Sequence, residues 1–161
     1  MNSDRKEMEK ELSDLNKKLG TIEDFDDFVD KLQMYIDKEE EELYSEIVRN
    51  EYRNPTNVGV IEHNNGTAKM NSDCGDTMQF DLQVENEMIS DVKFTATCGV
   101  TTATGSMLSK LIKGKKIDEA SKLTAKHLVN ALDGLPQENI HAAGLAIRTL
   151  KSAIKNYEKN K

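Results

Sequence analysis

The chain has 161 residues, enough for one domain with a modest core and a small appendage. Its net charge of −7 argues against nucleic acid as the main partner, because nucleic acids attract basic surfaces. With 37% hydrophobic and 32% charged residues and no tryptophan, part of the chain is expected to pack little. The apolar runs fall far short of the roughly 20 residues that span a bilayer, so no membrane partner is expected.

The acidic residues are concentrated near the N-terminus. Residues 1–42 hold 15 acids against 7 bases, whereas residues 43–161 hold 14 acids against 15 bases. This change predicts an acidic helical leader over residues 1–42 and a main domain over residues 43–161. The opening stretch MNSDRKEMEK does not resemble a signal peptide, and two cysteines do not suggest a disulfide framework. We therefore expect a cytoplasmic protein.

The leader has the spacing of amphipathic helices, because its apolar residues recur every three or four positions. Gly20 suits the residue after a helix and Thr21 suits the N-cap of the next one. We expect two helices, over about 4–19 and 22–42. The apolar stripe has three candidate partners: the main domain, the leader of a second copy in a homo-oligomer, and a separate docking protein.

Strand patterns occupy the middle of the main domain. A short amphipathic helix is expected to stop before Pro55, and residues 58–71 then alternate as a strand or hairpin. A second hairpin is expected to join Met78–Val84 to Ile89–Ala96.

Helical patterns complete the main domain. Predicted helices cover residues 101–114, 124–132 and 138–157. This order of elements predicts an α+β fold, in which a small antiparallel sheet of about three strands packs against C-terminal helices. The leader adds an N-terminal helical extension.

Both cysteines lie at junctions between predicted elements. Cys74 sits in a DCGD turn before a strand, and Cys98 lies between a strand and a helix, where the helix dipole favours a thiolate. The alternative for Cys98 is the role of a small buried hydrophobe. His141 falls in the first turn of the last helix and is a candidate to join the cysteines. His63 and His127 are expected at the surface.

Two cysteines with a histidine and an aspartate would make a set of four ligands suited to zinc or iron. The pattern lacks a Cys-x-x-Cys pair, a phosphate-binding glycine motif and any Ser–His–Asp arrangement. The sequence therefore favours a metal-binding protein over an enzyme.

Five segments occur in an order and with a spacing typical of one protein family. They are NPTNVG at 54–59, DCGDTM at 73–78, TCGVTTATGSML at 97–108, LIKGKKIDEA at 111–120 and GLPQENIHAAGLAIRTLKSAI at 134–154. From about Leu43 to the C-terminus, the chain resembles the IscU/NifU N-terminal-domain type of iron–sulfur cluster assembly scaffold.

The resemblance implies a scaffold rather than an enzyme. Such domains assemble a labile 2Fe–2S cluster from iron and the sulfur of a cysteine desulfurase, and then pass it to apo-proteins. They can also hold zinc at the same site. Carried over residue by residue, the ligands implied here are Cys74, Asp76, Cys98 and His141. The family's third cysteine directly follows that histidine, and its place is taken by Ala142.

Two departures from the family bear on function. Loss of one thiolate at Ala142 should weaken binding of a soft cluster more than binding of zinc. This leaves two alternatives open: a zinc-binding module that binds a desulfurase or a target without building clusters, and a degenerate paralogue whose leader drives assembly. The segment read by a dedicated Hsp70 chaperone in some members is LPQEN here, at 135–139, so release by that route is not expected. The interval from Cys98 to Ala142 has no room for the insertion typical of the SufU branch.

Overall fold

The computed structural model describes residues 2–20 and 23–161. The chain divides into two compact units, Met1–Leu43 and Tyr44–Lys161, and each has its own arrangement of elements. The predicted N-cap Thr21 lies outside the described residues, as does Ile22. In the described part of the chain, none of the helices is long and apolar enough to cross a membrane.

The first unit, which we call the leader, contains helices α1 (Asn2–Leu19) and α2 (Phe25–Leu43). Two backbone-to-side-chain hydrogen bonds fix the start of α2. The Asp27 N–H donates to Oδ1 of Asp24 at 2.8 Å, and the Glu23 N–H donates to Oδ2 of Asp27 at 2.9 Å. These bonds satisfy N–H groups that have no partner inside the helix. The bond from the Glu23 N–H, together with a bond from Lys31, lowers the pKa of the Asp27 carboxyl.

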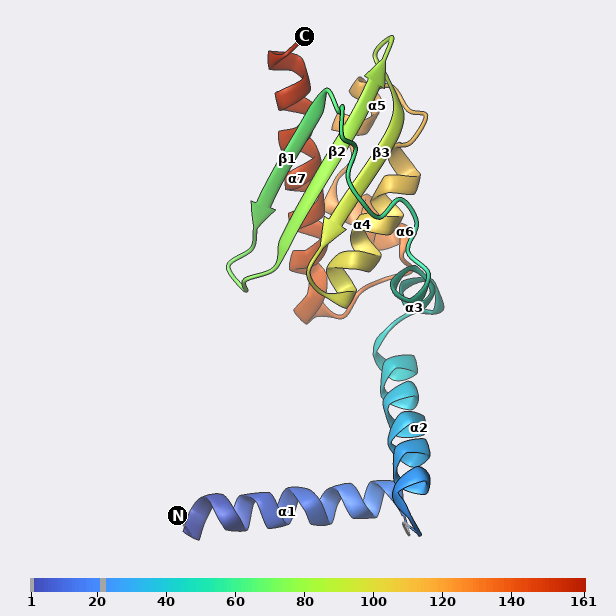
Figure 1. The fold of residues 1–161 in the computed structure, drawn as a ribbon, viewed down its shortest axis with the longest axis vertical. Coiled ribbons are helices and arrows are strands. Elements are labelled where there is room, and N and C mark those ends of the chain that lie inside the picture. Colours follow the sequence, from blue (N-terminus) through green and yellow to red (C-terminus); the bar gives the residue numbers. More distant parts are fainter. Residues whose placement is uncertain (1, 21–22) are drawn as a thin grey trace. The chain divides into compact units, whose positions relative to one another are not determined.

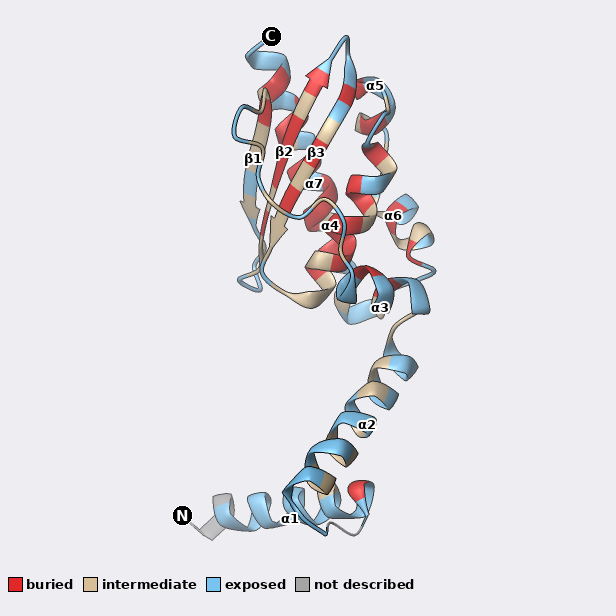
Figure 2. Ribbon diagram, turned by 45° about the vertical axis from the view of Figure 1, so that its right-hand side comes forward, coloured by how far each residue is buried: buried red, intermediate tan, exposed pale blue. Residues whose placement is uncertain are grey.

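The leader has almost no core of its own. Among its described residues, Leu19 is the single buried apolar side chain, and α1 and α2 are exposed along most of their length (Figure 2). Its exposed large apolar residues are Met8, Leu12, Phe25, Val29, Met34, Ile36 and Leu43. Of these, Leu12, Phe25, Val29 and Ile36 belong to the apolar stripe of the leader, and a stripe this exposed is typical of a surface that a partner covers.

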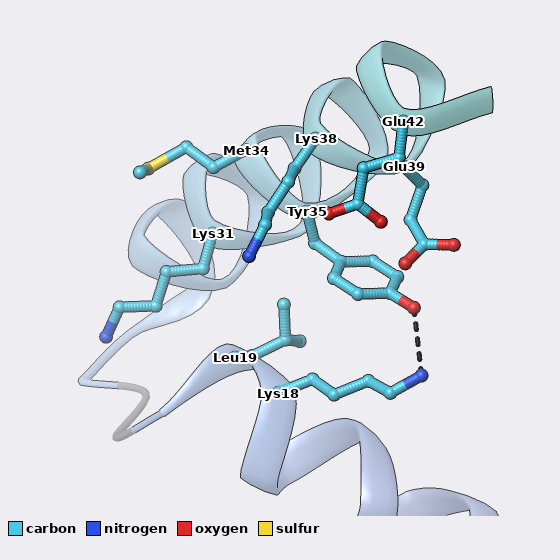
Figure 3. Close-up of a pocket in the computed structure, with 8 residues that line it drawn as sticks. All are labelled: Lys18, Leu19, Lys31, Met34, Tyr35, Lys38, Glu39 and Glu42. Carbon is cyan, nitrogen blue, oxygen red and sulfur yellow. Dashed lines mark hydrogen bonds between the residues drawn. The ribbon is translucent and has the colours of Figure 1, made fainter. Parts of the chain in front are cut away.

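A pocket of about 460 Å³ lies between α1 and α2 (Figure 3). Its lining residues are Lys18, Leu19, Lys31, Met34, Tyr35, Lys38, Glu39 and Glu42. The Lys18 ammonium donates a hydrogen bond to the Tyr35 hydroxyl at 2.9 Å, which links α1 to α2 beside the pocket (Figure 3). This bond raises the pKa of Lys18 above its ordinary value.

The second unit, the body, is built on a three-stranded antiparallel sheet. Strands β1 (Gly66–Asn71), β2 (Thr77–Glu85) and β3 (Met88–Ala96) lie in that order. The β2–β3 turn is made by Asn86 and Glu87, which both have positive φ, the conformation that suits a tight hairpin turn. The predicted α+β fold with about three antiparallel strands is confirmed.

The core lies between this sheet and the helices behind it. Phe80 pairs with Phe94 across β2 and β3, with ring centroids 5.9 Å apart, and Leu82 pairs with Val92 in the same layer. All four side chains are fully or almost fully buried. The predicted hairpin therefore has its apolar face turned inward, as the alternation of residues requires.

Helices cover one face of the sheet. The helices of the body are α3 (Glu46–Arg53), α4 (Gly99–Ile112), α5 (Ile117–Ser121), α6 (Ala125–Ala131) and α7 (Ile140–Lys159), with a short 3-10 turn at Gln137–Asn139. Helix α7 packs on β1 and β2, and α4 packs on β3 (Figure 1). Helix α5 was not predicted from the sequence. It is tied to the β2–β3 turn, where the Ile117 N–H donates to the Glu87 carbonyl at 2.9 Å.

The predicted strand or hairpin over 58–71 is correct only in its second half, which forms β1. The first half runs beside β3 instead, through an isolated bridge between Val58 and Phe94. Farther along, the Ile61 N–H donates to the Asp81 carboxylate at 2.9 Å. These contacts satisfy backbone groups that a hairpin would otherwise have paired.

Candidate metal centre

Cys74 lies at the exposed tip of the turn between β1 and β2. Three hydrogen bonds close this turn: Ser72 N–H to Asp76 O at 2.7 Å, Gly75 N–H to Ser72 O at 3.0 Å, and Asp76 N–H to Ser72 Oγ at 3.1 Å. Gly75 has φ +86°, and a Cβ at this position would touch nothing within 4 Å. Glycine is therefore favoured here by backbone conformation rather than by crowding. The turn presents the Cys74 thiol to solvent and keeps Asp76 half-buried at the start of β2.

Cys98 is the N-cap residue of α4 and is half-buried. Its backbone is extended, with φ −134° and ψ 169°, so the chain leaves β3 and enters the helix at this residue. The free N–H groups of a helix start carry partial positive charge, which favours an anionic sulfur. The predicted strand-to-helix junction is confirmed.

Two neighbouring side chains fix the surroundings of Cys98. The Thr101 hydroxyl oxygen lies 3.0 Å from the Cys98 sulfur and accepts the Cys98 N–H at 3.1 Å. The Tyr52 ring of α3 lies against Gly99, where a Cβ would come within 2.6 Å of a ring carbon. Gly99 is therefore required for α3 to pack this closely against the start of α4.

His141 is the second residue of α7, and its side chain is 42% exposed. Its Nε2 lies 3.9 Å from Oδ2 of Asp76, whose side chain is 22% exposed. The next residue, Ala142, is buried with 1% of its surface exposed. At the place where the resemblance implies a third thiol, the chain thus has a buried methyl group, which offers a metal no donor atom.

The turn carrying Cys74, the end of β3 and the start of α7 all lie at the same end of the body (Figure 1). Of the four predicted ligands, the structure brings Asp76 and His141 close together. In the part of the chain that is described, no three His, Cys, Asp or Glu side chains gather closely enough to hold a metal ion. Two thiols, a carboxylate and an imidazole nonetheless form a donor set whose chemistry fits zinc or iron.

The model of the NifU-like N terminal domain matches residues 43–161. The chain belongs to this family. The iron-sulfur cluster assembly scaffold protein IscU of Aquifex aeolicus is 45% identical over 118 residues, covering 71% of this chain and 75% of that protein. The iron-sulfur cluster assembly scaffold protein IscU 1 of Archaeoglobus fulgidus is 40% identical over 117 residues, covering 71% of this chain and 76% of that protein.

The body of this NifU-like chain also has the fold of a solved relative. The crystal structure of an N-terminal NifU-like protein from Brucella abortus superposes with a TM-score of 0.59 and covers 75% of this chain and 98% of that chain. At 15% sequence identity, this likeness concerns the fold alone.

The other two histidines of the NifU-like body are exposed, as predicted. His127 accepts the Thr124 N–H on its Nδ1 at 3.1 Å and so caps the start of α6. His63 is exposed in the segment before β1. Sequence reasoning missed Thr101 and Tyr52 as neighbours of Cys98. The spacing of Thr101, three residues after the helix N-cap, is the signal that could have found the first of them.

Proposed function

We propose that this NifU-like chain is an iron–sulfur cluster assembly scaffold, which holds a labile 2Fe–2S cluster or its iron and passes it to apo-proteins. The observation that carries the proposal is the position of Asp76, 3.9 Å from His141, at the end of the body where both cysteine-bearing junctions also lie (Figure 1). In this proposal Cys74, Asp76, Cys98 and His141 are the protein ligands of the cargo.

The mechanism we propose is ligand exchange, without covalent catalysis by the protein. Cys98 would supply the anchoring thiolate, since it is half-buried at a helix start. Cys74 lies exposed on its turn, and the His141 side chain is 42% exposed, so both can be reached by the cysteines of an acceptor. Asp76 offers a hard oxygen donor to a soft cluster, which favours easy replacement by an incoming thiolate.

The partners we propose follow from the cargo. A cysteine desulfurase would supply the sulfur and apo iron–sulfur proteins would receive the cluster. Two free cysteines are compatible with the reducing cytoplasm in which we place this activity. We also propose that the leader associates with the leader of a second copy, because it leaves its apolar stripe exposed and buries little more than Leu19 among its described residues.

A second candidate function is a zinc-binding interaction module of the same fold. The observation that favours it is Ala142, whose buried methyl group stands where a third thiolate would otherwise bind. Thiolate, carboxylate and imidazole are all ligand types that zinc binds in proteins, and four such ligands match its preferred coordination number. Such a module would bind a desulfurase or a target protein without building clusters.

Anaerobic reconstitution with ferric iron and sulfide separates these functions. The scaffold predicts a coloured protein with bound iron and sulfide, and Cys98→Ser should abolish the colour. His141→Ala should weaken cluster binding, whereas His127→Ala, which changes another exposed histidine of the body, should not. A colourless product that retains one zinc per chain against excess iron would favour the interaction module.

A further inference from the structure

The hydroxyl of Thr101 contacts three atoms of a single residue, Cys98. It accepts the Cys98 N–H at 3.1 Å, lies 2.9 Å from the Cys98 carbonyl oxygen and lies 3.0 Å from the Cys98 sulfur. Thr101 is fully buried. Every hydrogen bond of this buried hydroxyl in the structure therefore involves Cys98.

A threonine hydroxyl has one hydrogen to donate. In this structure the acceptors within its reach are the carbonyl oxygen and the sulfur of Cys98. The carbonyl oxygen already receives two other hydrogen bonds, from the Thr102 N–H at 2.8 Å and from the Thr102 hydroxyl at 2.7 Å. Two donors are enough for the two lone pairs of a carbonyl oxygen. The Thr101 hydroxyl can therefore turn its hydrogen away from the Cys98 carbonyl oxygen, which still accepts two hydrogen bonds from Thr102.

A sulfur bound to a metal carries no hydrogen, so it can only accept hydrogen bonds. We propose that Thr101 is a positioning residue for Cys98, and that its hydroxyl donates to the Cys98 sulfur when that sulfur binds a metal. The inference rests on the proposed function, in which Cys98 is a ligand. Rotation about a single side-chain bond moves the hydrogen from the carbonyl to the sulfur.

This hydrogen bond would act on the metal in two ways. It orients the Cys98 side chain toward the ligand position, and it draws electron density away from the sulfur. Hydrogen bonds to ligand sulfur atoms are one of the factors that set the reduction potential of iron–sulfur clusters. Thr101 would thus raise the reduction potential of a bound cluster and the energy of its sulfur-to-metal charge-transfer band.

The test uses the full-length protein, with Co²⁺ added anaerobically as the probe. Thr101→Val removes the hydroxyl and keeps the shape, and Thr101→Ser keeps the hydroxyl. Thr104→Val is the matched control, because Thr104 is a buried threonine of the same helix whose hydroxyl donates to the Thr101 carbonyl at 2.9 Å. Thr101→Ala also lacks the hydroxyl and replaces the valine variant if that variant does not fold.

Removing the hydroxyl should weaken Co²⁺ binding by about tenfold or more, the size of effect seen when an outer partner of a ligand is lost. It should also move the sulfur-to-cobalt band to longer wavelength and make the reduction potential of a reconstituted cluster more negative. Thr101→Ser should restore the Co²⁺ affinity, the band position and the reduction potential. Thr104→Val should leave these three quantities unchanged, even if it lowers the melting temperature. The shifts of the band and of the reduction potential separate a hydrogen bond to sulfur from a merely structural role, because a capping bond to the Cys98 N–H would not move them. Rescue by serine assigns both shifts to the hydroxyl.

Two negative results are distinguishable. If Cys98→Ser abolishes Co²⁺ binding while Thr101→Val and Thr101→Ala bind like the wild type with an unshifted band, the role of Thr101 is refuted and the proposed function stands. If Cys98→Ser binds Co²⁺ as tightly as the wild type, Cys98 is not a ligand, and both the role of Thr101 and the proposed ligand set fail.

Discussion

Nε2 of His141 and Oδ2 of Asp76 lie 3.9 Å apart. The two residues are distant in the sequence, because His141 lies at the start of α7 and Asp76 lies immediately before β2. Two ligands of one tetrahedral zinc ion, each about 2.1 Å from the metal, would be about 3.4 Å apart. The observed 3.9 Å between the two atoms is only slightly longer than this ligand-to-ligand distance.

Replacing either member of this pair should weaken metal binding. We expect Asp76→Ala and His141→Ala each to lower the affinity for Co²⁺ or Zn²⁺ by more than the roughly 10–100-fold typical of losing an outer partner. The measurement is anaerobic competition against a chelator of known affinity. His127→Ala is the control, because that histidine is exposed and caps a different helix. Wild-type affinity in both single variants would remove Asp76 and His141 from the ligand set.

A buried carboxylate joins α3 to the helix that Cys98 begins. Glu51 is 3% exposed and accepts hydrogen bonds from the Ser106 hydroxyl and the Lys110 ammonium, both in α4. Lys110→Ala would leave this charge buried without its cation. We expect a loss of about 1.5–3 kcal/mol in the free energy of unfolding, the range for a hydrogen bond to a charged group, because Glu51 is buried while the Lys110 side chain is 41% exposed.

Urea unfolding of full-length variants measures this loss. The control is Lys113→Ala, which removes a half-exposed ion pair to Asp91 with a 3.4 Å separation. Exposed pairs of this kind contribute about 0–1 kcal/mol. If Lys110→Ala lowers the free energy of unfolding by no more than Lys113→Ala does, then Lys110 is not needed to stabilise the buried Glu51 carboxylate.

The contact between α4 and β3 depends on a glycine. A Cβ at Gly105 would lie 2.5 Å from two ring carbons of Phe94, whereas a Cβ at Gly144 in α7 would have its nearest contact at 3.7 Å, on Arg148. Gly105→Ala should therefore destabilise the body by roughly 1–3 kcal/mol through overpacking. Gly144→Ala should stabilise it by about 0.5–1 kcal/mol through helix propensity. In thermal unfolding, Gly105→Ala should lower the melting temperature and Gly144→Ala should raise it. A shift in the same direction for both variants would contradict the packing of Gly105 against Phe94.

The sequence predicted those segments whose own residues show a clear helix or strand pattern, and it failed where a segment depends on distant partners. The Phe80–Phe94 hairpin was predictable because apolar residues alternate on both strands and a tight turn joins them. Residues 58–65 have a similar local pattern, yet their partners are the edge of β3 and the Asp81 carboxylate. Nothing in the local sequence shows those distant acceptors.

The candidate site follows the same rule. Cys98 and His141 were placed correctly because helix starts leave signals in the sequence. The Tyr52 ring over Gly99 could not be foreseen, because it depends on how α3 packs against α4. The short distance between Asp76 and His141 likewise arises from the tertiary fold and not from spacing in the chain.

Self-association of the leader predicts a specific effect of a single charge. Val29 and Ile36 lie seven residues apart on one face of α2, and both are exposed. Ile36→Glu should reduce the molar mass measured by light scattering to that of one chain. Met34→Glu adds the same charge at an exposed apolar residue outside this face, and should not. Because residues 1–42 carry 15 acids against 7 bases, added salt should strengthen the association.

A monomeric wild type across a range of salt concentrations would contradict self-association. An equal effect of Met34→Glu and Ile36→Glu would show that added charge, rather than the apolar stripe, controls the assembly. Neither result would bear on the metal site, since the four proposed ligands all belong to the body.

The most direct test of the scaffold is transfer of its cargo. The full-length protein is reconstituted anaerobically with iron and sulfide, freed of excess reagents, and mixed with an apo-ferredoxin in the presence of an iron chelator. Circular dichroism in the visible region then follows the cluster on each protein. A scaffold should lose its cluster as the cluster appears on the ferredoxin in matching amount, and the Cys98→Ser variant should transfer none. A wild-type protein that acquires no cluster, or that loses all of it to the chelator, is not a cluster scaffold.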